Sequence, residues 1–362
     1  MIPLRVDDYE ALARARMDPA AYDYYAGAAG DERTLAANRA AFDQITLRPR
    51  VLVDVSRIDL GTSVLGESIS FPVMLAPTAF NCLACADGEV AAARAAGASG
   101  TLMISSTLST CALEDVAEAA TGPMWFQLYV YKDRELTREL VSRAEAAGYR
   151  ALVLTVDTPL LGRRERDVRN RFVLPEGLSM KNFEAAMSDS QRWGVHSSFS
   201  AYVHDLFDAS LTWDAVAWLR AQTKLPLLLK GILTAEDARL ALDAGVDGVV
   251  VSNHGGRQLD GVAPSIVALP EVADAVAGRA EVLMDGGVRR GTDVLKALAL
   301  GARAVLVGRA YLWGLAAAGE DGVKDILRLL QDELRLAMAL AGRRSIASID
   351  RSLVSRPDGG IR

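Results

Sequence analysis

The stretch GVVVSNHGGRQLD, residues 248–260, decides the fold. Its opening run, Gly248–Val251, is short, apolar and β-branched, which predicts a buried strand rather than a helix. His254 and Arg257 follow at the end where parallel α/β folds carry their chemistry. The glycines between them allow a ligand to approach closely. A base beside a planar, permanently charged guanidinium indicates removal of a proton from a substrate that is anchored by its carboxylate.

Seven other short apolar runs resemble this one, and each is followed by a helix-like segment. Together with Gly248–His254 they give eight predicted strands, the others being Pro72–Pro77, Thr101–Ser106, Met124–Val130, Ala151–Asp157, Pro226–Gly231, Glu281–Gly287 and Ala304–Arg309. Helices are predicted between them, for example at Asp87–Gly97, Arg134–Gly148, Ala235–Gly245 and Thr292–Gly301. This alternation predicts an α/β fold, a closed (β/α)8 TIM barrel, with an open doubly wound sheet as the alternative.

The 362 residues are expected to form a single domain. Residues 1–70 precede the first strand and should form an N-terminal helical cap. Residues 71–320 should form the barrel, and 321–362 a C-terminal helix and tail. The segment 159–211, after the fourth strand, is longer than an ordinary loop and polar at Ser188–Arg192, so we expect a lid over the site. A disordered insertion is the alternative.

Composition excludes several classes of function. The formal net charge of -6 and the absence of a dense basic run argue against nucleic acid as a partner. No apolar run reaches the length of a membrane span, and three cysteines give no disulfide framework. We therefore expect a cytoplasmic protein that binds a small molecule.

Polar residues collect at the C-terminal ends of the predicted strands. Because side chains alternate between the two faces of a strand, Gln127 and Tyr129 share a face, as do Thr155 with Asp157 and Ser252 with His254. Nearly every strand end supplies such a residue, which predicts an active-site rim at the mouth of the barrel. The remaining members of this group are Thr78, Ser105, Ser106, Lys230, Asp285 and Arg309.

Two glycine- and arginine-containing loops follow the last two strands. They are Asp285–Gly291, with Gly286, Gly287 and Arg289, and Gly308-Arg309. Barrels commonly bind phosphate between these loops, where backbone N–H groups and a helix N-terminus favour an anion. We expect a phosphorylated ligand or cofactor here; glycines that serve only tight turns are the alternative.

Several of these motifs, in register over nearly the whole chain, resemble the FMN-dependent α-hydroxy-acid oxidase and dehydrogenase family, which includes glycolate, lactate and mandelate oxidases. The matching segments are Tyr22–Gly27, Asn38–Phe42, Arg48–Arg50, Phe126–Tyr129, Thr155–Pro159, Lys230-Gly231, Ser252–Asp260 and Asp285–Gly291. The resemblance implies oxidation of an L-2-hydroxy acid to the 2-keto acid, with FMN as cofactor. Oxygen would accept the electrons and give hydrogen peroxide, and a dehydrogenase that uses a quinone or another acceptor is the alternative.

The resemblance also implies residue roles. His254 would be the base, with Asp157 as its partner, and Arg257 and Arg164 would hold the substrate carboxylate; the neighbouring Arg163 is the alternative to Arg164. Tyr24 and Tyr129 would supply hydroxyl donors over the substrate. The implied FMN contacts are Pro77, Thr78, Ala79, Ser106, Gln127, Thr155, Lys230 and Ser252 along the ring and ribityl chain, and Asp285, Gly286, Gly287, Arg289, Gly308 and Arg309 around the phosphate.

Two departures from the family pattern stand out. Leu108 occupies the position where glycolate oxidases carry tryptophan, so we expect a larger pocket suited to lactate, a longer aliphatic acid or mandelate, with Phe80 as a further apolar wall. Cys82 and Cys85 replace a segment that often contains His-Pro. Their C-x-x-C spacing suggests a metal or redox site, but without a second pair incidental packing is favoured, and no metal is expected.

The sequence also bears on two other classes of protein and on the assembly. An inosine-monophosphate-dehydrogenase-like barrel would need a catalytic cysteine beyond the sixth strand, and all three cysteines lie earlier. A catalytically silent barrel would not explain why four residues occur together, namely His254, Arg257, Asp157 and Lys230. Relatives of this kind imply a homotetramer.

Overall fold

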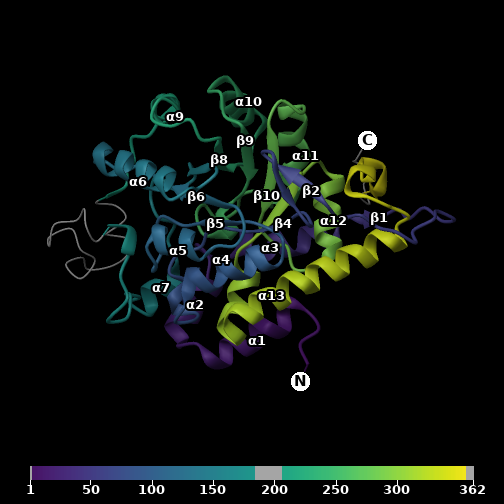
Figure 1. Ribbon diagram of the computed structural model, residues 1–362, viewed down its shortest axis with the longest axis horizontal. Coiled ribbons are helices and arrows are strands. Elements are labelled where there is room, and N and C mark those ends of the chain that lie inside the picture. The colour runs from purple at the N-terminus through teal and green to yellow at the C-terminus, as the bar shows by residue number, and fades with distance from the viewer. Residues whose placement is uncertain (1, 184–205, 356–362) are drawn as a thin grey trace.

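The computed structural model describes residues 2–183 and 206–355, and its centre is a closed barrel of parallel strands (Figure 1). The barrel strands are β4 (Val73–Leu75), β5 (Met103–Ser105), β6 (Met124–Leu128), β7 (Leu152–Thr155), β8 (Leu227–Ile232), β9 (Gly248–Val251), β10 (Glu281–Asp285) and β11 (Ala304–Val307). Each pairs with its successor along the chain, and β11 closes the ring by pairing with β4. The predicted TIM barrel is confirmed and the open sheet is excluded.

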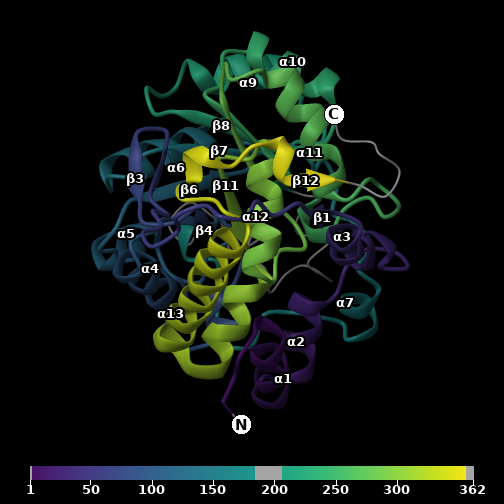
Figure 2. The ribbon, with the colours of Figure 1, turned by 90° about the vertical axis from the view of Figure 1, so that its right-hand side faces the viewer.

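Helices follow the strands and surround the barrel (Figures 1 and 2). Their bounds are α4 (Gly88–Ala98), α5 (Leu113–Ala119), α6 (Arg134–Ala146), α9 (Trp213–Arg220), α10 (Ala235–Asp243), α11 (Ser265–Val276), α12 (Gly291–Ala299) and α13 (Arg309–Leu340). Helix α13 is interrupted at Ala318 and Gly319, because Gly319 has a φ of 61°, which is incompatible with a continuous α-helix.

Alternation along each strand explains why the mouth of the barrel is polar. Apolar side chains such as Trp125, Val153 and Val250 fill the interior as one buried cluster, while their sequence neighbours pack outward against the helices. Two positions further along, the same inward face reaches the C-terminal end of the strand. It is there that the polar residues lie, namely Gln127 after Trp125, Thr155 after Val153, Ser252 after Val250 and Asp285 after Leu283.

The N-terminal segment contains the expected helices, α1 (Val6–Arg16), α2 (Pro19–Ala26) and α3 (Arg33–Asp43), and also strands that were not predicted. The hairpin β2 (Thr62–Val64) and β3 (Glu67–Ile69) places Val64 and Ile69 in the interior cluster, so it closes the N-terminal end of the barrel. β1 (Thr46–Leu47) pairs with β12 (Val354–Ser355). Figure 2 shows α1 and α2 beside the long α13.

The long segment after β7 is described on both sides of a gap. It contains α7 (Glu165–Arg169) and the 3-10 turn η2 (Lys181–Phe183), and description resumes at Leu206. The polar stretch Ser188–Arg192, on which the expectation of a lid was based, lies outside the described residues. No helix in residues 2–183 or 206–355 is both long and apolar enough to cross a membrane.

Candidate active site

A pocket that is partly open to solvent lies at the C-terminal mouth of the barrel. All but two of the predicted site residues line it: Tyr24, Pro77, Thr78, Ala79, Ser106, Leu108, Gln127, Tyr129, Thr155, Arg164, Lys230, His254, Arg257, Asp285, Gly286, Gly287, Arg289, Gly308 and Arg309. The other two, Asp157 and Ser252, lie directly behind the lining and contact it through hydrogen bonds.

His254 and Asp157 form a hydrogen-bonded pair, although they come from different strand ends. His254 begins the short 3-10 turn η5 (His254–Gly256) with a left-handed φ of 57°, a strained conformation that is typical of functional positions. Its Nδ1 lies 2.9 Å from Asp157 Oδ1, and Thr158 Oγ1 donates to the same oxygen over 3.1 Å. Asp157 therefore fixes the orientation of the imidazole.

Electrostatics determines the protonation states of this pair. Burial favours a raised pKa for Asp157, but His254, Lys230 and the hydrogen bonds hold that pKa below its ordinary value, so the group is a carboxylate. Burial and Lys230 lower the pKa of His254 despite the opposing effect of Asp157, so the imidazole is neutral at pH 7. A carboxylate can only accept, so Nδ1 carries the proton and Nε2 is left with its lone pair to act as a base.

Lys230 lies at the floor of the pocket in a second buried network. Its Nζ lies 3.0 Å from Ser252 Oγ and 3.2 Å from Asp285 Oδ2, and Ser252 Oγ donates to Asp285 Oδ1 over 2.6 Å. Burial acts against the charged ammonium, but the carboxylates of Asp285 and Asp157 raise the pKa of Lys230 overall. The network keeps a positive charge at a buried position.

Two arginines meet at the outer part of the pocket. Arg164 is buried, with Nε 3.4 Å from the carbonyl oxygen of Arg257, whereas Arg163 is exposed. Burial and the nearby Arg257 lower the pKa of Arg164 to about 10, so the Arg164 guanidinium remains charged at neutral pH. Asp167 balances part of this charge, and the partly exposed Arg257 adds a second guanidinium beside Arg164, so the two together favour an anion. Arg164 lines the pocket, and Arg163 does not.

Tyrosine hydroxyls flank these arginines. The Arg257 guanidinium stands over the Tyr24 ring, 4.9 Å from its centroid, and donates to the Tyr24 carbonyl oxygen over 2.5 Å. Burial raises the pKa of both Tyr24 and Tyr129, so their hydroxyl groups stay protonated and can donate.

The outer wall of the pocket is apolar. Leu108, Leu161 and Phe207 line it, and the Phe207 ring lies 4.4 Å from that of Tyr129. Phe80 does not line the pocket as expected: it is fully buried behind Tyr24, with 5.6 Å between ring centroids. Its left-handed φ of 62° turns the side chain inward toward the core.

The other end of the pocket is suited to a phosphate. Arg289 and Arg309 line this end and are partly exposed; desolvation lowers the pKa of both, Arg39 further lowers that of Arg289, and Arg257 and Arg289 further lower that of Arg309. Arg309 donates to the carbonyl oxygens of Tyr25, Gly255 and Gly27. The glycines Gly286 and Gly287 adopt left-handed φ values of 98° and 85° that expose backbone N–H groups.

Between these ends runs a row of polar groups that fits a flavin. Gln127 Nε2 donates to Thr155 Oγ1, and its Oε1 accepts from Ser106 Oγ and from the backbone N–H of Thr107. These contacts fix the orientation of the Gln127 amide in a pocket that Lys230 and Pro77–Ala79 also line. Clustered cationic charge at one end and fixed donors along the floor are the groups that the phosphate and ring of FMN require.

The arginines, the buried lysine and the histidine–carboxylate pair at the barrel mouth are typical of a flavin-dependent oxidoreductase. The family model for FMN-dependent dehydrogenase matches residues 13–356. The chain therefore belongs to the family of FMN-dependent 2-hydroxy-acid oxidases and dehydrogenases.

Individual relatives agree over nearly full length. The chain is 53% identical to glycolate oxidase of Spinacia oleracea, over 97% of this chain and 95% of the relative. It is also 53% identical to L-lactate oxidase of a Nostoc species, over 97% and 98%. A solved structure of mandelate oxidase with (S)-4-hydroxymandelic acid superposes with a TM-score of 0.91 at 46% identity, over 96% of this chain and 97% of that one.

These matches confirm the predicted family, the cofactor FMN and the class of enzyme, a 2-hydroxy-acid oxidase. Sequence reasoning did not anticipate Phe207, Leu161 or Phe172, which stacks on Tyr24 with 4.4 Å between centroids. All three come from the long segment after β7. The only feature of the sequence that could have indicated these contacts is the presence of aromatic residues within a polar insertion.

Proposed function

We propose that this chain oxidises an L-2-hydroxy acid larger than glycolate, of lactate size or above, and delivers the electrons to oxygen with release of hydrogen peroxide. The observation that carries the size preference is that Leu108, Leu161 and Phe207 give apolar lining to the same pocket that His254 lines. An aliphatic side chain at residue 108 leaves room where an indole would fill the pocket. The proposed L hand is supported by the relatives named L-lactate oxidase and mandelate oxidase with an (S)-acid.

The first step that we assign to this chain is orientation of the substrate. Arg164 and Arg257 bind the carboxylate by charge-assisted hydrogen bonds, which removes the repulsion between the two guanidinium groups. Tyr24 and Tyr129 donate hydroxyl hydrogen bonds from above. The side chain of the hydroxy acid then lies against Leu108.

The second step is proton removal. His254 Nε2 accepts the proton that leaves the hydroxy acid, and the Asp157 carboxylate stabilises the imidazolium that forms. Bound FMN supplies the two-electron acceptor. The ammonium of Lys230, held by Asp285, stabilises negative charge that develops at the floor of the pocket.

The test is a steady-state screen of the FMN-loaded enzyme under air, with peroxide as the readout. The substrates are both hands of lactate, 2-hydroxybutyrate, longer acids and mandelate, with glycolate for comparison. We expect higher kcat/KM for L-lactate or a larger L-acid than for glycolate, by about tenfold or more. A preference for glycolate contradicts the size assignment, and turnover only with an added dye favours the dehydrogenase alternative.

We also infer that the chain is one domain, 1–362, acting as a cytoplasmic homotetramer. The inference draws on the resemblance to the family. It is tested by light scattering and by localisation of the tagged protein in the cells that produce it: a monomer, or enzyme in another compartment, contradicts it.

A further inference from the structure

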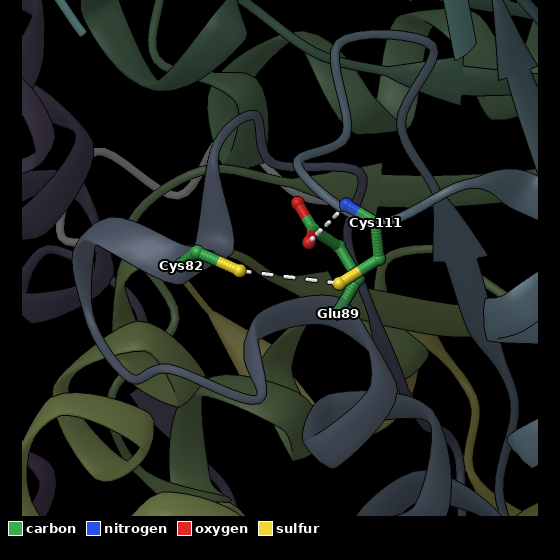
Figure 3. Close-up of side chains that lie close together, drawn as sticks. All are labelled: Cys82, Glu89 and Cys111. Carbon is green, nitrogen blue, oxygen red and sulfur yellow. Dashed lines mark hydrogen bonds between the residues drawn. The ribbon is translucent and has the colours of Figure 1, made fainter. Parts of the chain in front are cut away.

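Two cysteines from neighbouring loops of the catalytic face lie in contact. Cys82 belongs to the 3-10 turn η1 (Asn81–Leu83) after β4, and Cys111 lies just before α5. Their Sγ atoms are 3.9 Å apart and face one another (Figure 3). Cys82 thus contacts Cys111 rather than Cys85, the other cysteine of the C-x-x-C spacing.

We propose that Cys82 and Cys111 form a reversible disulfide, with hydrogen peroxide as the oxidant. This rests on the proposed function to the extent that turnover with oxygen would supply the peroxide beside the pair. The disulfide would join the loop that carries Thr78 to the loop that carries Leu108, so the modification would tether two walls of the active site.

The geometry permits closure with little backbone movement. The two loops are already joined by hydrogen bonds from Cys82 N to Thr110 Oγ1, 3.0 Å, and from Phe80 N to the Leu108 carbonyl oxygen, 3.1 Å. A disulfide needs a sulfur separation of about 2 Å, which side-chain rotation can supply from van der Waals contact. Gly88 leaves room for the Cys82 thiol, since a Cβ there would lie 2.5 Å from Sγ.

Glu89 completes the cluster in Figure 3 but does not favour a metal ion. Its two oxygens accept hydrogen bonds from the backbone N–H groups of Asn81, Thr110 and Cys111 and from the side chains of Asn81 and Thr110. A cation would have to displace these donors from a buried carboxylate. Glu89 instead organises both loops and leaves the two thiols as the reactive groups.

The two thiols are not equivalent. The hydrogen bond with Cys111 and that with Thr110 lower the pKa of Cys82, whereas the bond with Cys82, burial and Glu89 raise the pKa of Cys111. In this proposal Cys82 is the attacking thiol and Cys111 the resolving one. In the reduced state its thiol also contacts the Ala86 carbonyl oxygen over 3.3 Å.

The chemistry balances in two steps. The Cys82 thiolate attacks one peroxide oxygen, the O–O bond breaks, and the departing hydroxide takes up a proton to leave as water, giving a sulfenic acid on Cys82. The Cys111 sulfur then attacks the Cys82 sulfur and displaces the hydroxyl, which leaves as a second water with the proton of Cys111. Overall, two thiols give up two electrons and two protons, and one peroxide becomes two waters.

The experiment uses the FMN-loaded full chain, reduced, freed of metal by a chelator and treated with added hydrogen peroxide. Thiol titration and peptide mass mapping should show loss of two of the three free thiols and a Cys82–Cys111 cross-linked peptide, both reversed by dithiothreitol. Because the cross-link closes a loop of about 30 residues, the unfolding midpoint should rise by about 3–5 °C. Cys85→Ser should respond like the unchanged chain, and Cys82→Ser and Cys111→Ser should show no cross-link.

Adding peroxide makes this test independent of the oxidase activity, and a second arm supplies L-lactate and air, with and without catalase. If added peroxide forms the cross-link but L-lactate and air do not, the disulfide is supported and the failure lies with the proposed oxidase function. Survival of all three thiols, a Cys82–Cys85 bond, or oxidation only to sulfinic acid overturns the proposal. A metal ion recovered in equimolar amount before chelation and lost in Cys111→Ser also overturns it.

Discussion

His254 Nδ1 lies 2.9 Å from Asp157 Oδ1, although the two residues are 97 positions apart in the sequence. The pair joins the end of the fourth barrel strand to that of the sixth. It holds a neutral imidazole with its free nitrogen toward the pocket, which is the state that a general base must have before it takes a proton.

The first prediction concerns the pH dependence of this pair. Because burial lowers the pKa of His254 below 6.5, kcat/KM should stay level from neutral pH downward and fall only below that value, as the imidazole gains a proton. Replacing the partner, Asp157→Asn, removes the charge that raises the pKa. The acid limb should then move to still lower pH while kcat drops about 100-fold or more. An acid limb that moves upward would contradict the assignment.

A second prediction separates two adjacent arginines. Arg164→Met should lower kcat/KM for a 2-hydroxy acid about 10- to 150-fold, because a charge-assisted hydrogen bond to the carboxylate is lost. Arg163→Met is the matched control, since that side chain is exposed, and it should change kcat/KM less than about twofold. Equal losses in both variants would mean that the buried position is not the anchor.

The substrate preference should follow the side chain at residue 108. Leu108→Trp places an indole in the apolar wall and should shift the ratio of kcat/KM for glycolate over the larger acids by about tenfold or more in favour of glycolate. The FMN absorbance spectrum serves as the folding control. An unchanged ratio with intact flavin would place the size filter elsewhere, with Phe207 as the next candidate.

FMN affinity should depend on the arginines at the end of the pocket where we expect the phosphate. Arg289→Met should raise the Kd for FMN, measured by quenching of flavin fluorescence on titrating apoprotein, by about tenfold or more. Arg303→Met removes an arginine that forms only an exposed pair with Glu281, and its Kd should stay within about twofold. If the two variants bind FMN equally well, the phosphate lies outside the Arg289 loop.

Backbone geometry around Asp157 gives a fifth prediction. Gly231 has a φ of 115°, and a Cβ there would lie 2.6 Å from Asp157 Cβ. Gly231→Ala should cost about 2–4 kcal/mol of unfolding free energy and lower kcat by displacing Asp157. Gly245→Ala, at a φ of 73° with open space around it, should cost only about 1 kcal/mol and leave kcat unchanged. Chemical denaturation and steady-state rates measure both, and equal behaviour of the variants would refute the contact.

The barrel and the ring of polar strand ends could both be predicted from the amino-acid sequence. Both follow from local rules: apolar runs alternating with helices specify the fold, and the two-residue period of a strand decides which side chains face inward. Gln127, Thr155 and Ser252 could therefore be placed at the mouth without coordinates. The family motifs added the roles expected of His254 and the arginines.

Only the tertiary structure decided which loop residues meet. The choice of Arg164 over Arg163, the partnership of Cys82 with Cys111 rather than Cys85, and the place of Phe207 beside Tyr129 depend on the path of loops that no periodic pattern constrains. The position of the β2–β3 hairpin is also set by tertiary packing, because Val64 and Ile69 are buried in the apolar interior at the N-terminal end of the barrel. Contacts of this kind are set by burial across long separations, which the order of residues along the chain does not encode locally.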